Sequence, residues 1–86
     1  MSPAASVDPE LLSILRCPES LQPLRLAEDS EVQRLLSQAR HGALGNLAGA
    51  KVAPDFEALL VREDGKRAYF VRDGIPVMLI DEAVAL

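Results

Sequence analysis

The chain has 86 residues, a formal net charge of −4, and a composition that is 49% hydrophobic but only 3% aromatic. Such a length accommodates one domain, which we expect to span residues 1–86, and a domain so small usually needs a disulfide, a metal ion or a partner for stability. Cys17 is the only cysteine and His41 the only histidine. An intrachain disulfide is therefore excluded and a four-ligand structural zinc site is disfavoured. We expect no cofactor, and we expect a partner chain or self-association.

The acidic balance also restricts the class of partner. Proteins that bind nucleic acids draw much of their affinity from Lys and Arg, so direct nucleic-acid binding is disfavoured. No apolar run approaches the roughly 20 residues that span a bilayer. Residues 1–7 are neither basic nor followed by a signal-peptide core, so no export signal is indicated. We expect these residues to form a loose N-terminal tail. One unpaired cysteine without an export signal fits a cytoplasmic protein that has no membrane partner.

The first predicted element is a short helix that begins at Asp8, a capping residue, with Pro9 in its first turn. It should end near Arg16, because Pro18 disfavours helical geometry at Cys17. Its apolar face would consist of Leu11, Leu12, Ile14 and Leu15. The alternating residues 24–27 then predict a half-buried strand.

A second helix should follow, since Ser30 and Gln33 have the spacing of a capping box. Its apolar positions follow helical periodicity at Val32, Leu35, Leu36 and Ala39. Gly42 is a suitable C-terminal stop. Residues 43–54 leave two readings open, a ragged continuation of the helix or a connector. We assign residues 29–49 as an inserted helical segment.

The C-terminal half predicts three strands joined by tight turns, at residues 56–62, 67–72 and 75–80. Asp64-Gly65 is typical of a two-residue hairpin turn, and Asp73-Gly74 predicts a second turn. A helical turn could begin at residues 81–83. The order of elements predicts an α+β fold with a small four-stranded antiparallel sheet, an N-terminal helix against it and the inserted helical segment.

Two segments of the chain are familiar in combination. They read Leu-Leu-Ser-Ile-Leu-Arg-Cys-Pro at residues 11–18 and Ala-Tyr-Phe-Val-Arg-Asp-Gly-Ile-Pro-Val-Met-Leu at residues 68–79. Together they resemble the two ends of the small activator subunit shared by tRNA, rRNA and release-factor methyltransferases. They resemble even more closely the short bacterial proteins of the same family, whose role is much less clear. The resemblance covers residues 10–27 and 56–83.

The chain departs from that family in its zinc ligands. The family's usual beginning is Leu-x-Cys-Pro-x-Cys, whereas Ser20 stands where the second cysteine would be. Many relatives also carry a cysteine in the strand before the Asp-Gly hairpin, where this chain has Leu60-Val61-Arg62. The resemblance therefore implies a degenerate, zinc-ribbon-like fold without zinc, in which Cys17 is a remnant of the ligand set. Residues 28–55 also form a longer segment than in the shortest relatives.

No group of side chains indicates catalysis. Cys17 is best interpreted as a core residue rather than a reactive thiol or a ligand, and His41 as a residue that complements the end of a helix. The carboxylates lie at predicted helix starts, turns and the tail, where they would be solvated: Asp8, Glu10, Asp29, Glu31, Glu63, Asp64, Asp81 and Glu82. No phosphate-binding or dinucleotide-binding motif is present. We expect the protein not to be an enzyme.

The candidate functional site is the last predicted strand. Pro76 has no amide hydrogen to donate to the hydrogen-bond ladder of a sheet, which indicates that it lies on an edge strand. An apolar run on an edge strand needs another segment or a partner protein to cover it. The resemblance implies that, as in the activator family, the subunit's sheet extends the sheet of the methyltransferase. Apolar side chains would then pack across the interface between the two sheets. The expected partner-binding residues are Arg72 and Asp73 at the rim with Ile75, Pro76, Val77, Met78 and Leu79. In the rival reading, residues 77–80 are buried in the domain's own core.

The leading hypothesis is thus an adaptor that binds and stabilises or activates an S-adenosylmethionine-dependent methyltransferase. The alternative is a stand-alone structural domain that forms a homodimer through the same edge and has no enzyme partner. A third reading places zinc between the Cys17 residues of two chains.

Overall fold

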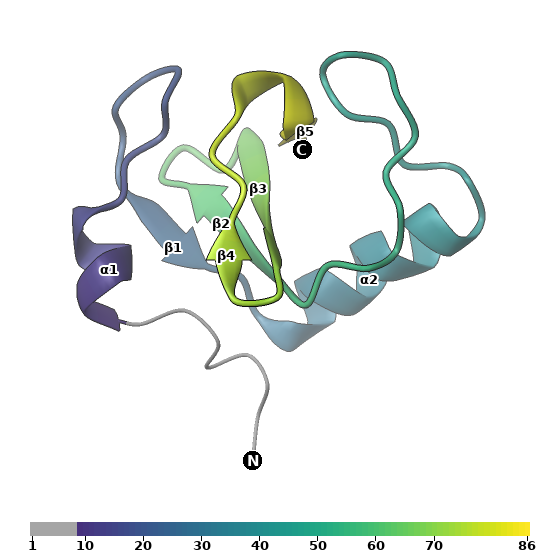
Figure 1. Ribbon diagram of the computed structural model, residues 1–86, viewed down its shortest axis with the longest axis horizontal. Coiled ribbons are helices and arrows are strands. Elements are labelled where there is room, and N and C mark those ends of the chain that lie inside the picture. Colours follow the sequence, from purple (N-terminus) through teal and green to yellow (C-terminus); the bar gives the residue numbers. More distant parts are fainter. Residues whose placement is uncertain (1–8) are drawn as a thin grey trace.

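The computed structural model describes residues 9–86, so the predicted tail, the Asp8 cap and the Leu11 side chain lie outside the described part. The elements in chain order are α1 (Pro9–Ile14), β1 (Leu24–Leu26), α2 (Asp29–Arg40), β2 (Ala58–Arg62), β3 (Arg67–Arg72), β4 (Ile75–Pro76), a 3₁₀ turn (Ile80–Glu82) and β5 (Val84–Ala85) (Figure 1). The strands pair antiparallel in the order β1-β2-β3-β4, and β5 also pairs with β3. The predicted α+β fold with a small antiparallel sheet is confirmed. None of the helices in residues 9–86 is long and apolar enough to cross a membrane.

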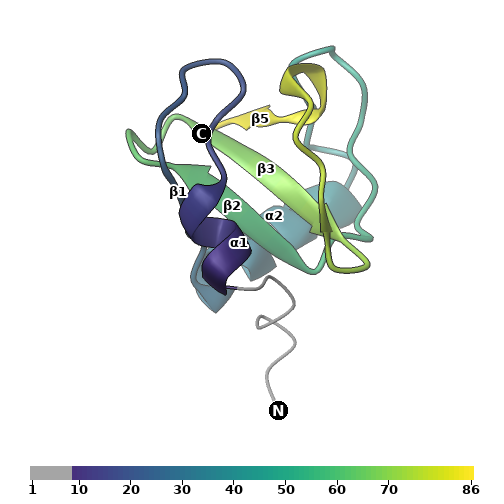
Figure 2. The same cartoon turned by 60° about the vertical axis from the view of Figure 1, so that its left-hand side comes forward.

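Helices cover both faces of the sheet, with α1 and α2 on opposite sides (Figure 2). The strand β2 is buried along its whole length, and alternate side chains of β2 and β3 enter two separate cores. The core beneath α2 contains Leu59 and Phe70, while the core on the α1 side contains Leu60 and Tyr69. This alternation follows from the two-residue period of a strand. Burial on both faces explains why residues 58–61 read as a continuous apolar run.

The first helix is shorter than the prediction. It ends at Ile14, and Arg16 already forms an isolated antiparallel bridge with Pro23. Leu12 and Leu15 pack against the core on the α1 side. Ile14, however, is 72% exposed, so its assignment to the apolar face is wrong. A six-residue helix makes less than two turns, so it presents only a narrow face to the sheet.

The second helix has the predicted apolar face but a different start and a shorter extent. Its N-cap is Glu28, and the Glu31 carboxylate accepts a hydrogen bond from the Glu28 amide at 3.1 Å. Ser30 lies inside the first turn and is not the cap. The helix ends at Arg40, followed by Gly42 with φ +67°, as expected. Residues 43–57 contain no helix, so the helical assignment of residues 29–49 is wrong beyond Arg40.

The two Asp-Gly turns differ in length. Asp73 and Gly74 have φ values of 52° and 75° and form the two-residue connection between the paired residues Arg72 and Ile75. Positive φ at both central positions is typical of a type I′ hairpin. The connection between β2 and β3, by contrast, spans residues 63–66. Its predicted two-residue form is wrong, and within this longer loop Asp64 accepts hydrogen bonds from the Lys66 amide and the Arg62 guanidinium.

The last predicted strand is also interrupted. Only Ile75 and Pro76 belong to β4, and the chain then leaves the edge of β3 before it returns to the same edge as β5. We call residues 77–83 the C-terminal arch (Figures 1 and 2). Its carbonyls find partners outside the sheet, since the amides of Leu47 and Ala48 donate to Ala83 and Asp81. A strand through Ile80 was therefore predicted incorrectly.

Candidate functional site

The C-terminal arch and the adjoining β4 expose large apolar side chains on the surface. Ile75 is 66% exposed, Leu79 is 61% exposed and Ile80 is 38% exposed. Met78, between them, is half-buried and packs against the core on the α1 side. The rival expectation that residues 77–80 are buried in the domain's own core is therefore wrong for Leu79 and Ile80.

A groove of about 620 Å³ lies against the arch. It is lined by Pro18, Met78, Leu79, Ile80, Asp81 and Glu82. One wall comes from the turn after Cys17 and the other from the arch, so the groove joins segments that are about 60 residues apart in the chain. Its surface is mainly apolar, and Asp81 and Glu82 also belong to its lining. We refer to it below as the arch groove.

The predicted site residues divide between the two faces of the sheet. The register pairs Arg72 with Ile75 and Val71 with Pro76. Directly paired residues share a face, so Arg72 and Ile75 lie on the α2 side while Pro76 lies on the α1 side with Val71. Of the predicted site residues, only Met78 and Leu79 line the arch groove, whereas Ile75 lies at the same edge on the α2 side.

The two predicted rim residues differ in their surroundings. The Nε of Arg72 lies 2.6 Å from the Asp55 carboxylate, and its guanidinium lies 5.2 Å from the centroid of the Phe70 ring. Asp73 is exposed in the turn. Val77 is half-buried and donates its amide hydrogen to the Phe70 carbonyl at 2.8 Å, so it extends the ladder by one bond.

Sequence reasoning missed part of the arch groove. Pro18 was considered only as a helix stop, and Asp81 and Glu82 only as solvated residues. The sequence carried no signal for the groove, because Pro18 and Met78 are 60 positions apart in the chain. Only the tertiary fold shows that these segments meet.

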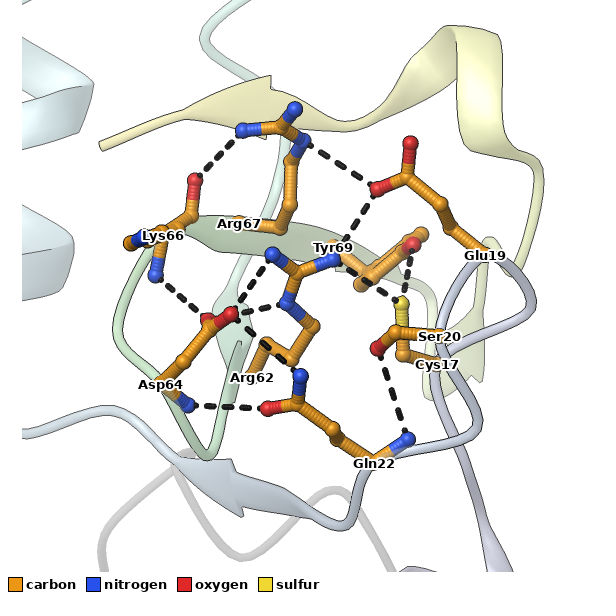
Figure 3. Close-up of polar contacts among 9 residues, drawn as sticks. All are labelled: Cys17, Glu19, Ser20, Gln22, Arg62, Asp64, Lys66, Arg67 and Tyr69. Carbon is orange, nitrogen blue, oxygen red and sulfur yellow. Dashed lines mark hydrogen bonds and ion pairs between the residues drawn. The ribbon is translucent and has the colours of Figure 1, made fainter.

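A second group of residues surrounds Cys17 on the same side of the sheet. Its Sγ lies 2.9 Å from the Tyr69 hydroxyl and 3.8 Å from Nη1 of Arg62 (Figure 3). Cys17 and Tyr69 have no exposed surface, and Arg62 is 7% exposed. Arg62 is the only buried charged residue in the part of the chain that the structure describes.

Arg62 connects the loop after α1 to the β2–β3 hairpin through its guanidinium. Its Nε and Nη2 donate to the two carboxylate oxygens of Asp64 at 2.8 and 2.7 Å, and its Nη1 donates to Glu19 at 2.9 Å. Gln22 adds a further link, because its side chain both accepts from the Asp64 amide and donates to the Asp64 carboxylate (Figure 3). The loop of residues 17–22 is thereby held against the β2–β3 hairpin. We call Cys17, Glu19, Arg62, Asp64 and Tyr69 the arginine cluster.

The arginine cluster shifts the ionisation of its members. Burial opposes ionisation of the Cys17 thiol, but hydrogen bonds from the Tyr69 hydroxyl and from Ser20 and Glu19 outweigh it and lower the pKa to about 7. Burial and the bond to Cys17 raise the pKa of Tyr69. The bidentate bond from Arg62 holds the pKa of Asp64 well below its usual range. A lowered pKa favours the thiolate, which the nearby guanidinium stabilises.

The arginine cluster does not have the features of a metal centre. Within residues 9–86, no group of three or more His, Cys, Asp or Glu side chains could hold a metal ion. Cys17 has no exposed surface. A zinc ion shared between the Cys17 residues of two chains would need that thiol at the surface, so the third reading is wrong for this fold. The interpretation of Cys17 as a core residue is confirmed.

His41 lies where the sequence placed it, at the C-terminal end of α2. Its Nδ1 is 2.7 Å from the Ser37 carbonyl. The imidazole therefore satisfies one of the last carbonyls of the helix.

The fold and the site define a small α+β protein whose sheet is covered on both faces and whose exposed edge carries an apolar arch. No family model matches the chain. It is 37% identical over 81 residues to a UPF0434 protein of Bradyrhizobium sp. strain BTAi1, which covers 94% of this chain and 83% of the relative. It is also 35% identical over 80 residues to UPF0434 proteins of Sinorhizobium medicae and Pseudomonas paraeruginosa, with 86% and 87% of those relatives covered. The chain belongs to the UPF0434 protein family.

A solved structure supports the same conclusion for the fold. The solution NMR structure of XF2673 from Xylella fastidiosa matches with a TM-score of 0.71 at 31% sequence identity. The match covers 91% of this chain and 80% of that one. The resemblance to short bacterial proteins is therefore confirmed.

Proposed function

We propose that this chain is a non-catalytic adaptor that binds a partner protein through the exposed edge formed by β4 and the C-terminal arch. The observation that carries the proposal is the exposure of Ile75, Leu79 and Ile80, at 66%, 61% and 38%. Large apolar side chains gathered on one edge of a small acidic domain are typical of a protein interface. β4, the Val77 amide and β5 already bond to most of the β3 edge, so a partner would contact the exposed side chains of β4 and the arch rather than add a strand to β3.

The partner that we propose is an S-adenosylmethionine-dependent methyltransferase. Support comes from the two segments at residues 11–18 and 68–79, which resemble the ends of the methyltransferase activator subunit. The second of these segments contains Ile75 and Leu79, the most exposed apolar residues of the edge. Binding would cover an apolar surface of the enzyme and stabilise its folded form by mass action.

The sheet half would then correspond to a zinc ribbon in which ion pairs have replaced the metal. In the activator family, cysteines would be expected near Cys17, Ser20 and the end of β2. Here Arg62 occupies the end of β2 and contacts Cys17 and Glu19. A guanidinium that joins the two segments supports this correspondence, because it connects the same two parts of the chain that a metal would connect.

A pull-down from the source cell's lysate tests the proposal. The bait is the tagged full chain, with bound proteins identified by mass spectrometry, and the test variant is Ile75→Asp/Leu79→Asp. The matched control is Ile14→Asp, because Ile14 is 72% exposed but lies on α1. We expect a near-stoichiometric methyltransferase with the wild type and the control but not with the test variant.

Two other outcomes contradict the proposal. Capture of the same methyltransferase by the Ile75→Asp/Leu79→Asp variant, with the fold retained by circular dichroism, would show that the edge is not the interface. A pull-down that contains only the bait, together with a concentration-dependent mass in sedimentation velocity, would favour the self-associating structural domain instead.

A further inference from the structure

Deepening the proposed function, on which this inference rests, we propose that the arch groove accepts a segment of the partner that presents an apolar side chain next to Lys or Arg. The apolar side chain would lie against Pro18, Met78 and Leu79. The cationic side chain would face Asp81 and Glu82, which also line the groove.

The carboxylates of the groove have no internal partner. Neither Asp81 nor Glu82 takes part in a side-chain hydrogen bond or an ion pair with the residues that the structure describes, and both are exposed. In contrast, Glu19, in the turn beside Pro18, is committed to Arg62 at 2.9 Å and to Arg67 at 3.4 Å. The free negative charge near the groove therefore lies on the arch, beside the apolar side chains of Leu79 and Ile80.

The arch is held in place before a partner binds. The Glu82 amide donates to the Leu79 carbonyl at 3.1 Å, and the Ala48 amide donates to the Asp81 carbonyl at 3.2 Å. Met78 anchors the other side of the arch in the core. These contacts fix the spacing between the apolar wall and the carboxylates, which lowers the entropy lost on binding.

The same charges disfavour the other candidate occupants. A symmetric contact between two copies through this groove would bring Asp81 and Glu82 of both chains towards the same axis, because a two-fold interface uses the same patch twice. Like charges placed opposite each other oppose association, and the chain as a whole carries a net charge of −4. An anionic lipid surface would be repelled for the same reason. Charge complementarity therefore favours a cationic, apolar protein segment.

Fluorescence anisotropy with labelled synthetic peptides tests this inference. Three dodecapeptides are used: one of Leu and Lys, one in which Glu replaces Lys, and one in which Ser replaces Leu. We expect saturable binding of the Leu/Lys peptide and at least about tenfold weaker binding of the Ser/Lys peptide, which cannot bury a leucine. We expect the Leu/Glu peptide to bind more weakly than the Leu/Lys peptide. Because its charges are repelled by the groove, its binding should be weaker at low salt than at high salt.

The protein variants are Glu82→Lys and Glu63→Lys, which change the net charge equally. Glu63 is exposed in the β2–β3 loop and does not line the arch groove. Because exposed ion pairs are weak, we expect Glu82→Lys to weaken binding of the Leu/Lys peptide by about twofold to fivefold, and Glu63→Lys to leave it unchanged. Increasing salt should reduce the difference between the two variants.

Several results would overturn the inference. Among the peptide results, these are no binding of any peptide and equal binding of the Leu/Lys and Leu/Glu peptides. Among the protein variants, the contradicting result is equal effects of Glu82→Lys and Glu63→Lys. A dimer in sedimentation velocity that Leu79→Asp dissociates would also overturn it. The Leu79→Asp variant separates this failure from failure of the proposed function. If it abolishes capture of the methyltransferase while Glu82→Lys leaves peptide binding unchanged, the edge binds the partner but the charge of the groove does not select it.

Discussion

The guanidinium of Arg62 lies 3.8 Å from the sulfur of Cys17, a residue 45 positions earlier in the chain. This contact joins the loop after α1 to the end of β2, and both residues are buried. The same guanidinium forms a bidentate pair with Asp64. A charge that is buried with several partners is costly to leave unpaired but well tolerated when every partner is present. The fold therefore depends on Arg62 more than on any exposed arginine.

Replacement of Arg62 by methionine should destabilise the protein clearly. The change would leave Asp64 without its cationic partner and Glu19 with only the longer contact to Arg67, and it would weaken the attachment of the residue 17–22 loop to the hairpin. The control is Arg25→Met, since Arg25 lies on the surface and its pair with Glu31 is exposed. Urea unfolding measures both. Equal unfolding midpoints for the two variants would contradict the central role of Arg62.

The lowered pKa of Cys17 predicts that stability depends on pH. The pKa is about 7 in the folded protein and 9.0 for an unperturbed thiol, so between these pH values the unfolded chain binds more protons. Stability should therefore rise from pH 7 to pH 9, and this contribution should be lost as the pH falls through 7. Urea unfolding at several pH values, with Cys17→Ala as the reference, measures it. Parallel pH profiles for the two proteins would contradict the prediction.

Removal of the Tyr69 hydroxyl tests the cause of that shift. In Tyr69→Phe, the Cys17 thiolate loses the bond seen at 2.9 Å, so its pKa should rise above 7. The protein should also lose about 1 kcal/mol of stability, the usual net value of a hydrogen bond. Thiolate absorbance near 240 nm as a function of pH gives the pKa, with Cys17→Ala as the blank. An unchanged pKa would assign the shift to Ser20 and Glu19 instead.

The β2–β3 loop offers a test of backbone strain. Gly65 has φ +73° and an added Cβ would meet nothing within 4 Å, so Gly65→Ala should cost about 1–2 kcal/mol from backbone conformation alone. The matched control is Gly45→Ala, because Gly45 does not have a positive φ and the nearest atom to its added Cβ is at 3.8 Å. Thermal unfolding compares the two, and a larger loss in Gly45→Ala would be inconsistent with this account.

Core and arch leucines should respond differently to truncation. Leu60 is fully buried on the α1 side of the sheet, and Leu60→Ala should cost about 2–5 kcal/mol through the cavity that it leaves. Leu79 is largely exposed, so Leu79→Ala should change stability by less than about 0.5 kcal/mol. Chemical denaturation measures both. A large loss in Leu79→Ala would mean that the arch is part of the core and would weaken the case for an interface there.

The sequence predicted best where a residue's role is local. The boundaries of β3, the end of α2 before Gly42 and its four buried apolar positions all agree with the structure. Each depends on a short-range property, either hydrophobic periodicity or the ability of glycine to adopt positive φ. The predicted strand at residues 75–80 failed because continuation of a ladder depends on neighbours. Here the arch is bonded to Leu47 and Ala48, residues of a loop for which the sequence carried no clear pattern.

The candidate site shows the same division. The two segments that carry the family resemblance, and the apolar character of Ile75 and Leu79, were determined by the sequence alone. The side chains that share a surface were decided by the tertiary structure. Pairing with β3 sends Ile75 and Pro76 to opposite faces, and the fold brings Pro18 to the wall of the arch groove. The sequence indicated only that Arg62 is the polar end of a strand. In the structure the residue 17–22 loop packs over Arg62 and buries it. The sequence could not predict this, because burial and charge pairing depend on contacts between residues far apart in the chain.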